Sequence, residues 1–432
     1  MNVEKYYIET YGCQMNKADS ELIAGMLEGF SCRSVDSPEE ADIILVNTCT
    51  VRENAEKRAI SRLSQFKGLK KKNPDLILGL LGCVAQRNRG KIISEKSFID
   101  IVLGPDSYRH LPEIFNGCKF PLLDVKLSRA EVYEGIIPYR RNKINAWISI
   151  MRGCDKFCSY CIVPYTRGRE RSRSLKSIID EVKKAIDDGY REVTLLGQNV
   201  NSYKYNNYRF PDLLDAVSGV QSVQRVRFIS PHPKDIDNKM LELMRDRQNI
   251  CNHIHLPLQA GSSRVLKSMN RVYNQREYLS VAEKIHGYLS DVAITTDIIV
   301  GFPGEMEEDF LETLKVMDKV VFDSAFMFKY SPRPGTKAAL MKDGMSEEEK
   351  ADRLTRVIEK QREHTLIRNN ALVGSVQEVL IEDLSKKDPK EKMGRTVTNK
   401  IVIIKEGETE IGDLVKVKIE KALGVSLFGK IV

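Results

Sequence analysis

The sequence predicts an α/β protein of three domains: an N-terminal parallel α/β sheet, a central partial (βα)6 TIM-type barrel, and a small C-terminal β-barrel. Three observations predict this architecture. Apolar strands alternate with helical stretches over residues 1–110, a second alternating series begins at Ala146, and residues 372–432 contain only short β-branched strands between polar turns. We place the domains at 1–118, 145–368 and 369–432, with 119–144 as a linker.

Length and composition are consistent with this division. A chain of 432 residues suits two to four domains, because a domain takes about 150 residues. Its apolar runs are too short to cross a bilayer and its start, MNVEKYYIETYG, lacks a signal-peptide core, so we expect a cytoplasmic protein without a membrane partner. There, its nine cysteines are expected to be ligands or core thiols, not disulfides. The net charge of +8 permits a nucleic-acid partner without demonstrating one.

The first predicted strands share a distinctive ending. YYIETYGC, ADIILVNTC and DLILGLLGC read as strands separated by helices, FIDIVLGP reads as a further strand, and the first three end in Cys13, Cys49 and Cys83. Because the carboxyl ends of parallel strands meet at one edge of the sheet, these thiols are expected to converge there. A single such cysteine would ordinarily be a small core residue. Three at equivalent ends indicate a metal centre, whereas Cys32, Cys118 and Cys251 read as structural.

The linker carries Pro121, Pro138 and the mixed-charge PYRRNK, and a second domain follows it. Its expected strands are AWISIMRG, EVTLLG, VQRVRFISP, HIHLPLQA, AITTDIIVGFPG and SAFMFKYSP. Helical stretches lie between them, such as SLKSIIDEVKKAIDDG and NQREYLSVAEKIHGYL. Six strand-helix units predict an incomplete barrel, whose chemistry is expected at the carboxyl ends of its strands.

A C-x3-C-x2-C run follows the first strand of this barrel. Cys154, Cys158 and Cys161 offer three thiolates with no fourth nearby. A [4Fe-4S] cluster held for electron transfer alone has four cysteines, so three leave one iron open to an exogenous chelator. Structural zinc is the alternative, but it usually takes its ligands as two pairs. Tyr160, directly before the last cysteine, could flank a planar group at the open iron.

The later barrel strands end in small or polar residues where a barrel site lies. Ordinary loop chemistry is the alternative, since glycine punctuates any α/β fold. His253 and His255 alternate on the fourth strand and read as packing residues before metal ligands. The small or polar positions at the second to sixth strand ends include Gly197, Gln198, Asn199, Ser230, His232, Gln259, Asp297, Gly301, Tyr330 and Arg333.

Four arginines follow the cysteine run in TRGRERSRS: Arg167, Arg169, Arg171 and Arg173. In an extended segment they would share one face. A solvated basic face is the ordinary interpretation, but their position beside the cysteine run favours contacts with the phosphates of a polyanionic substrate. The C-terminal β-barrel has a shape often used on RNA, although its nearly balanced charge leaves its use open.

The whole chain resembles the methylthiotransferases of the radical S-adenosylmethionine superfamily, which combine a methylthiotransferase domain, a radical-SAM barrel and a TRAM domain. The resemblance rests on motifs along the entire chain. YGCQMN, Arg52 in NTCTVR, and CSYCIVPYTRGRERSR are similar to the MiaB-type tRNA enzymes, whereas Thr50 also occurs in the threonylcarbamoyl-adenosine branch. The other matching motifs are GCVAQR, LLGQNVNSY, HLPLQAGSSRVLKSMNRVY, TTDIIVGFPGE and YSPRPGTKAA.

The resemblance implies 2-methylthiolation of N6-isopentenyladenosine at tRNA position 37. It implies a [4Fe-4S] cluster on Cys154, Cys158 and Cys161 whose open iron chelates S-adenosylmethionine. Reductive cleavage of that molecule then gives a radical able to break an aromatic C–H bond. It implies an auxiliary [4Fe-4S] cluster on Cys13, Cys49 and Cys83 that carries sulfur from an exogenous source, and a second S-adenosylmethionine that methylates it. The expected cofactor-binding residues are Tyr160, Gly197, Gln198, Ser230, Gln259, Asp297 and Gly301.

The implied partners are a tRNA anticodon stem-loop, an electron donor such as flavodoxin or ferredoxin, and a sulfur or cluster donor system. A base in a single-stranded loop leaves its stack more easily than one in a duplex. Arg167, Arg169, Arg171 and Arg173 are expected to hold phosphates, and both open irons to act as the catalytic centres without a side-chain acid or base. Three alternatives stay open: an enzyme acting on a ribosomal aspartyl residue, one acting on threonylcarbamoyl-adenosine tRNA, and a non-catalytic iron-sulfur RNA-binding sensor.

Overall fold

The N-terminal domain is a six-stranded parallel sheet in the order β2-β1-β3-β4-β5-β6. The computed structural model describes residues 3–50, 53–141, 144–405 and 407–432. Every residue of β3 and β4 is buried, as expected of central parallel strands covered on both faces. The strands are β1 (Lys5–Tyr11), β2 (Arg33–Ser34), β3 (Ile43–Thr48), β4 (Ile77–Gly82), β5 (Ile101–Leu103) and β6 (Leu122–Asp124).

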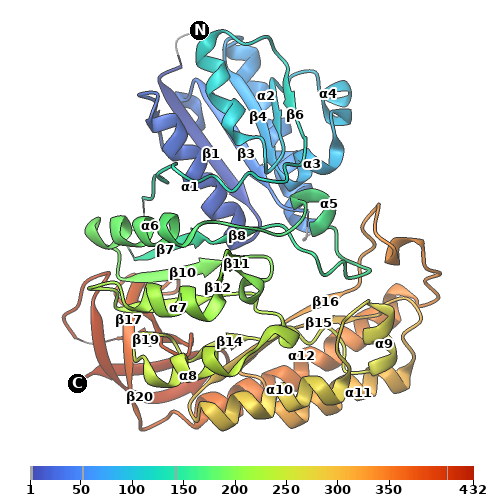
Figure 1. Ribbon diagram of the computed structural model, residues 1–432, viewed down its shortest axis with the longest axis vertical. Coiled ribbons are helices and arrows are strands. Elements are labelled where there is room, and N and C mark those ends of the chain that lie inside the picture. Colours follow the sequence, from blue (N-terminus) through green and yellow to red (C-terminus); the bar gives the residue numbers. More distant parts are fainter. Residues whose placement is uncertain (1–2, 51–52, 142–143, 406) are drawn as a thin grey trace.

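Helices cover both faces of this sheet (Figure 1). Ile23 and Leu27 of α1 pack on one face, and Leu63 and Phe66 of α2 pack on the other. β6 differs from the prediction, because it lies within residues 119–144, which were expected to be linker. Its pairing with β5 extends the sheet past residue 118. The helices are α1 (Gln14–Glu28), α2 (Glu53–Lys72), α3 (Cys83–Asn88) and α4 (Lys91–Glu95), with 3-10 turns η1 (Pro38–Glu40) and η2 (Tyr108–Asn116).

The central domain is the predicted arc of six parallel strands. β7 (Asn145–Ser149), β10 (Glu192–Leu196) and β13 (Arg225–Phe228) form one half in the order β13-β10-β7. β14 (His253–His255), β15 (Ala293–Val300) and β16 (Ser324–Lys329) form the other half. A parallel bridge from Val226 to Ile250 joins the halves. The helices are α5 (Val163–Arg167), α6 (Leu175–Asp187), α7 (Phe210–Ser218), α8 (Asn238–Asp246), α9 (Ser263–Ser268), α10 (Gln275–Tyr288), α11 (Glu307–Val320) and α12 (Glu347–Asn370).

Alternate residues of these six strands face opposite ways. Ile148, Leu195 and Ile294 belong to the large core under the helices. The other face of the arc, here called the concave face, carries Trp147 on β7 and Leu196 on β10, and Met15 and Ala18 of α1 pack against these two residues. The N-terminal domain therefore covers the carboxyl ends of β7 and β10, as its position above the barrel in Figure 1 shows.

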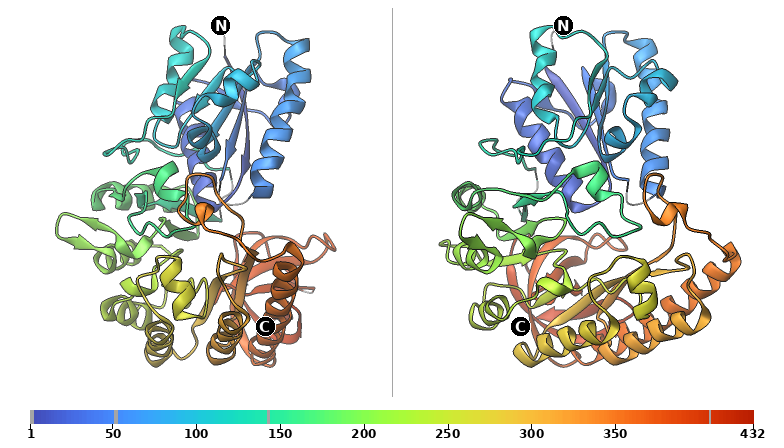
Figure 2. Two further views of the ribbon diagram at one scale, coloured as in Figure 1. Left: turned by 90° about the vertical axis from the view of Figure 1, so that its right-hand side faces the viewer. Right: turned by 45° about the vertical axis from the view of Figure 1, so that its right-hand side comes forward.

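The C-terminal domain is a closed five-stranded barrel in the order β17-β18-β19-β21-β20, as predicted. Val379, Ile381, Val402, Val417 and Ile419 fill its centre. It lies beside α12 at the lower part of the molecule (Figure 2). Its strands are β17 (Val376–Leu384), β18 (Lys392–Thr396), β19 (Ile401–Ile404), β20 (Leu414–Leu423) and β21 (Ser426–Ile431).

Two arginines on the concave face of β13 fasten this small barrel to the arc. Arg225 donates to the backbone carbonyls of Arg395 (2.8 Å) and Glu378 (3.0 Å). Arg227 donates to the carbonyl of Thr396 at 2.7 Å and pairs with buried Glu192 at 2.7 Å. The small barrel therefore covers the lower part of the concave face. Within the described part of the chain, no helix combines the length and apolar character that a membrane span requires.

Candidate functional site

The C-x3-C-x2-C run forms a loop after β8 (Met151–Arg152) and before α5. Gly153 begins the loop with a φ of +80°, and a Cβ there would lie 2.0 Å from the carbonyl oxygen of Arg169, so only glycine fits. The backbone N–H of Cys154 donates to Gly168 (3.1 Å), and that of Cys161 to Cys158 (3.0 Å). All three thiols are partly exposed. The loop therefore presents three cysteines to a common space at the carboxyl end of β7.

One residue that sequence reasoning missed points at these cysteines. Arg271 donates from Nη1 to the Cys158 sulfur at 3.3 Å, and its guanidinium lies 4.9 Å from the centre of the Tyr273 ring. Tyr160 is close enough to be influenced by the same guanidinium. Arg271 follows α9, more than a hundred residues after the cysteines. The MNRVY segment that carries it was the available signal.

Polar groups without partners gather at the next two strand ends. In the regions that the structure describes, Gln198 Oε1, Asn199 Oδ1 and His232 Nε2 are buried and lack a hydrogen-bond partner. Burial and nearby cations lower the pKa of His232 to about 2, so this ring is neutral. Its Nδ1 accepts from the backbone N–H of Lys234 at 3.2 Å, so Nε2 carries the proton and is free to donate. Buried polar groups are nearly always paired in folded proteins. The end of β10 and the loop after β13 therefore fit a polar cofactor.

Two strand ends also hold strained backbone. Ser230 has a φ of +60° and Gln259 a φ of +71°. Residues other than glycine rarely adopt such positive φ angles. Such conformations concentrate at functional sites. Gly197 packs tightly under Met151, where an added Cβ would meet the Met151 side chain at 2.8 Å. The expected cofactor-binding positions of β10, β13 and β14 thus lie on one rim of the arc.

The expected positions at the end of β15 are on the same rim. Asp297 faces the concave side and its Oδ2 lies 3.2 Å from Nε2 of His255. His255 also contacts the Thr295 hydroxyl at 3.0 Å, in agreement with the predicted packing role of the two histidines. Gly301 has a φ of +70°, and the aliphatic stem of Lys350 fills the space where a Cβ would lie.

The N-terminal cysteines converge as predicted, although each lies just after its strand instead of within it. Cys13 caps α1, Cys49 follows β3 and Cys83 begins α3. A hydrogen bond with Cys49, aided by the positive charge of Arg167, lowers the pKa of Cys13 to about 6. A thiol with such a pKa is largely thiolate at neutral pH, the form that binds metals. Arg52 lies outside the described residues.

Burial raises the pKa of three other cysteine thiols. It raises the pKa of Cys83, an effect that the charge of Arg167 opposes. It raises the pKa of Cys154 to about 11 and that of Cys161 to about 12. These thiols are neutral near pH 7 and would lose their protons on binding a metal.

Neither cysteine group resembles a mononuclear site. Among the residues that the structure describes, no three His, Cys, Asp or Glu side chains are arranged to hold a single ion. A [4Fe-4S] cluster is different, because each cysteine binds a separate iron. Converging thiols, a lowered pKa at Cys13 and unpaired polar groups nearby all fit such clusters.

The arginine run departs from the prediction. Arg167, Arg171 and Arg173 are buried, with 3%, 7% and 7% of their surface exposed, so they cannot hold phosphates as expected. Arg167 pairs with Asp19 of α1 at 2.8 Å, Arg171 with Asp106 at 2.7 Å, and Arg173 with Glu181 at 2.5 Å. The first two pairs join the barrel to the N-terminal domain. The reason for the difference is that burial beneath a second domain is invisible in a local pattern of alternating charges.

Arg169 is the exception, since 66% of its side chain is exposed. It pairs with Asp155 at 2.6 Å and lies over the Phe157 ring. Position and exposure keep it available to a polyanion beside the cysteine loop.

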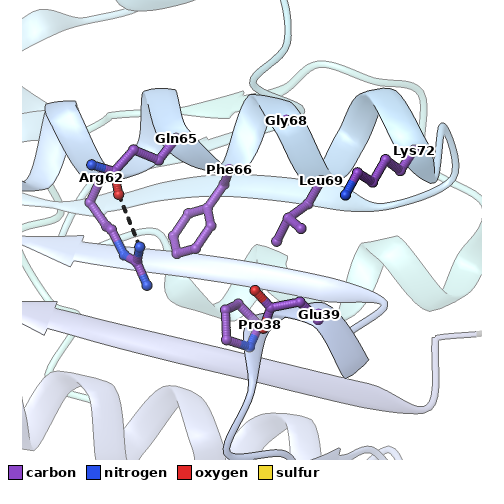
Figure 3. Close-up of a pocket in the computed structure, with 8 residues that line it drawn as sticks. All are labelled: Pro38, Glu39, Arg62, Gln65, Phe66, Gly68, Leu69 and Lys72. Atoms are coloured by element: carbon purple, nitrogen blue, oxygen red, sulfur yellow. Dashed lines mark hydrogen bonds between the residues drawn. The ribbon is translucent and has the colours of Figure 1, made fainter.

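A shallow hollow of about 240 Å³ on the N-terminal domain lies elsewhere, between η1 and α2 (Figure 3). Pro38 and Phe66 form its apolar part, and Arg62 donates to Gln65 across its rim at 2.9 Å. No cysteine lines it. It takes no part in the site.

Three family descriptions match successive parts of the chain. Residues 5–104 match the uncharacterized protein family UPF0004, residues 148–317 the radical SAM superfamily, and residues 370–432 the TRAM domain. The radical SAM match assigns an iron-sulfur cluster and S-adenosylmethionine to the central domain, where the C-x3-C-x2-C loop lies.

Solved structures with a similar fold include a radical S-adenosylmethionine methyltransferase from Kitasatospora setae. Its TM-score is 0.58 at 13% identity, with 79% of this chain and 77% of that chain covered. The cobalamin-dependent radical enzyme OxsB has a TM-score of 0.54 at 10% identity, with 84% and 56% covered. At these identities the likeness concerns the fold alone.

Much closer relatives span the full length. Proteins from Azobacteroides pseudotrichonymphae and Porphyromonas gingivalis are both 47% identical, covering 99% of this chain and 97% and 95% of their own lengths. A Thermoanaerobacter protein is 46% identical, with 99% and 92% covered. All three are named tRNA-2-methylthio-N(6)-dimethylallyladenosine synthase. Together with the two groups of cysteines, these relatives show that the chain is a radical SAM enzyme and belongs to the tRNA-2-methylthio-N(6)-dimethylallyladenosine synthase family.

Proposed function

We propose that this enzyme converts N6-isopentenyladenosine at position 37 of tRNA to its 2-methylthio derivative. The observation that carries the proposal is the pair of three-cysteine groups, one at the carboxyl edge of each sheet, with Arg167, six residues after Cys161, lying against Cys83. Replacing hydrogen by sulfur on an aromatic carbon needs one centre to remove hydrogen and another to deliver sulfur. Two separate groups of three thiols supply both.

Cys154, Cys158 and Cys161 hold a [4Fe-4S] cluster in this proposal. When bound, the cluster and S-adenosylmethionine supply the radical that no side chain can provide. Arg271 offsets the negative charge of the Cys158 thiolate, while Tyr160 and the unpaired groups of Gln198 and His232 support binding of the polar cofactor. Gly197, Ser230, Gln259, Asp297 and Gly301 form the rest of its rim.

Cys13, Cys49 and Cys83 hold the auxiliary [4Fe-4S] cluster. The lowered pKa of Cys13 and the adjacent Arg167 support binding of an anionic centre. An exogenous source delivers the sulfur, and a second S-adenosylmethionine provides the methyl group. A flavodoxin- or ferredoxin-like protein provides electrons, and a dedicated donor system provides sulfur and clusters.

The substrate base enters through the part of the concave face between the N-terminal domain and the small barrel. Phe326 and Phe328 point from β16 into this region and are 53% and 39% exposed, which is unusual for phenylalanines on a central sheet. His255 and Asp297 lie beside Phe326. Apolar rings next to a polar cofactor rim suit an adenine that carries a branched five-carbon group. Arg169 and the TRAM domain are placed to hold the surrounding RNA.

The test is an anaerobic reaction of the reconstituted protein with reductant, S-adenosylmethionine, sulfide and tRNA bearing isopentenyladenosine, followed by mass spectrometry of the digested nucleosides. We expect a 2-methylthio product that is absent from the Cys13→Ala and Cys154→Ala variants, with Cys251→Ala as the matched control. Cleavage of S-adenosylmethionine with unmodified tRNA would overturn the substrate while leaving the enzyme class intact. A cluster that does not react with S-adenosylmethionine would overturn the function itself.

A further inference from the structure

The buried guanidinium of Arg167 extends from the barrel toward the N-terminal cysteines, and one of its nitrogens has no hydrogen-bond acceptor among the described residues. Arg167 ends α5, only six residues after Cys161, and α5 packs against α3, whose first residue is Cys83. Its Nη2 donates to Asp19 at 2.8 Å. Its Nη1 is fully buried and has no hydrogen-bond partner in residues 3–50, 53–141, 144–405 or 407–432.

An unused donor in such a place indicates a missing acceptor. A buried N–H without a partner loses its hydrogen bonds to water and gains nothing in return, so folded proteins rarely contain one. The Arg167 guanidinium lies within loose hydrogen-bonding range of the Cys83 thiol and close to Cys13, and it acts to lower the pKa of both thiols. Neutral thiols accept hydrogen bonds weakly. Anionic sulfur accepts them well, because the charge strengthens the bond.

The local charge balance gives a second, independent indication. Two buried carboxylates at the domain interface, of Asp19 and Asp106, face three buried guanidiniums, of Arg152, Arg167 and Arg171. Three positive charges against two negative ones leave one positive charge over within this described cluster. Because burying an uncompensated charge is strongly unfavourable, this excess favours negative charge at the neighbouring cysteines, either as the Cys13 thiolate or as an anionic centre bound there. The excess lies at Arg167 and Arg152, which share the Asp19 carboxylate.

We propose that Arg167 is a positioning residue of the N-terminal cysteine centre and donates a hydrogen bond from Nη1 to an anionic sulfur bound there. This inference rests on the proposed function, because it requires the auxiliary cluster. The acceptor is either a sulfide of the cluster itself or an external hydrosulfide or methanethiolate at its open iron. Both share the same chemistry, a compact sulfur anion in a buried, positively charged site.

The first experiment tests the cluster's own sulfide. In full-length protein with Cys154, Cys158 and Cys161 all changed to Ala, only the auxiliary cluster remains, and its potential can be titrated by electron paramagnetic resonance. A hydrogen bond to sulfur stabilises the more negative, reduced cluster. We expect Arg167→Gln to lower the ratio of reduced to oxidised cluster at a fixed potential by about tenfold, within the range of charged hydrogen bonds, and Arg167→Lys to recover part of it.

The second experiment tests an external sulfur anion. Hydrosulfide and methanethiolate are titrated onto the same oxidised cluster, and their binding is followed by the change in its absorption and resonance spectra. If the acceptor is external, Arg167→Gln weakens binding of both by about tenfold while the potential measured without them stays unchanged. If the acceptor is a cluster sulfide, the potential shifts in their absence.

Arg171→Gln is the matched control, because Arg171 is buried at the same interface and pairs with Asp106. A purely structural clamp would make the Arg167 and Arg171 variants behave alike, with neither potential nor affinity changed relative to the parent, and this would overturn the inference. If no Arg167 variant assembles the cluster, the parent that lacks Cys154, Cys158 and Cys161 is labelled with 15N-arginine: a 15N coupling to its reduced auxiliary cluster supports the hydrogen bond and its absence refutes it. Failure of the parent to bind any second cluster would instead overturn the proposed function.

Discussion

At the scale of single residues, the arginine run shows how burial changes the role of a charge. Arg167 and Arg171 are both charged, and each forms an ion pair with a carboxylate of the N-terminal domain. Arg169, between them in sequence, faces solvent. An RNA phosphate can reach Arg169 but neither of its neighbours.

We therefore expect Arg169→Ala to weaken tRNA binding by a few-fold and to reduce the slope of log affinity against log salt by about 0.7–0.9, the contribution of one phosphate contact. Fluorescence anisotropy with labelled tRNA at several salt concentrations measures both. Lys176→Ala is the control, since Lys176 is exposed on α6 and pairs with Asp180. Equal slopes for the Arg169 variant and the parent would remove Arg169 from the interface.

His253 gives a pH dependence at the same scale. Burial, together with the positive charges of Arg227, Arg395 and Lys400, lowers its pKa well below the ordinary 6.5. Below pH 6.5 His253 therefore binds a proton in the unfolded chain but not in the folded chain. The free energy of unfolding falls as the pH falls.

We expect His253→Gln to lose less unfolding free energy than the parent between pH 7 and pH 5.5. Urea unfolding of the full-length proteins at both pH values measures this difference. His110→Gln, at an exposed histidine, should follow the parent. Parallel losses in all three proteins would contradict the assignment.

The positions of the six cysteines at strand ends could be predicted from sequence, because cysteine spacing and strand ends are local features. The partners of Arg167 could not, since Asp19 lies 148 residues away and on another domain. Arg271 was missed for the same reason: its distance from Cys158 along the chain hides a contact of 3.3 Å.

At the scale of elements, β16 shows an alternation that core packing does not explain. Ala325 and Met327 pack under the helices, whereas Phe326 and Phe328 face the concave side and remain exposed. The strand itself was predicted correctly from its apolar residues. Which face would be open depended on the two flanking domains, and no pattern within the strand records their positions. The same limit applies to β6, whose three residues pair with β5 only once the sheet has formed.

If these rings receive the isopentenyl group, Phe326→Ala should lower the preference for isopentenylated over unmodified tRNA. We expect the ratio of the two affinities to fall by about tenfold, since a lost contact with a few methylene groups has that effect. Competition binding with the two tRNAs measures it. Tyr208→Ala removes an exposed ring from β12 (Tyr208–Arg209), away from the site, and should keep the ratio. An unchanged ratio for Phe326→Ala would assign the rings another role.

At the scale of the whole molecule, the arc is covered from above by α1 and from below by the small barrel. The lower contact depends on Arg225 and Arg227, whose guanidiniums donate to the backbone carbonyls of Arg395 and Thr396. The three domains were predictable from the sequence, because the pattern of strands and helices changes along the chain. Their docking was not, because it is made by charged residues in a strand that looked ordinary.

Arg227→Met should leave Glu192 as a buried carboxylate without its partner and destabilise the protein by about 3–5 kcal/mol. We expect the TRAM domain to become sensitive to limited proteolysis near residue 371 before the rest of the chain unfolds. Arg245→Met, at an exposed residue of α8, is the control. Equal protection of both variants would show that other contacts hold the domain.

The short helix α5 limits how the length of this part of the chain can change in evolution. Because one residue advances a helix by about 100°, adding or deleting a single residue between Cys161 and Arg167 would turn the guanidinium away from Asp19 and Cys83. A change of length in this turn would therefore disrupt the contact even if every residue in it were kept. The heritable signature of this site is therefore C-x3-C-x2-C-x5-R, in which the spacing to the arginine is as constrained as the spacing of the cysteines.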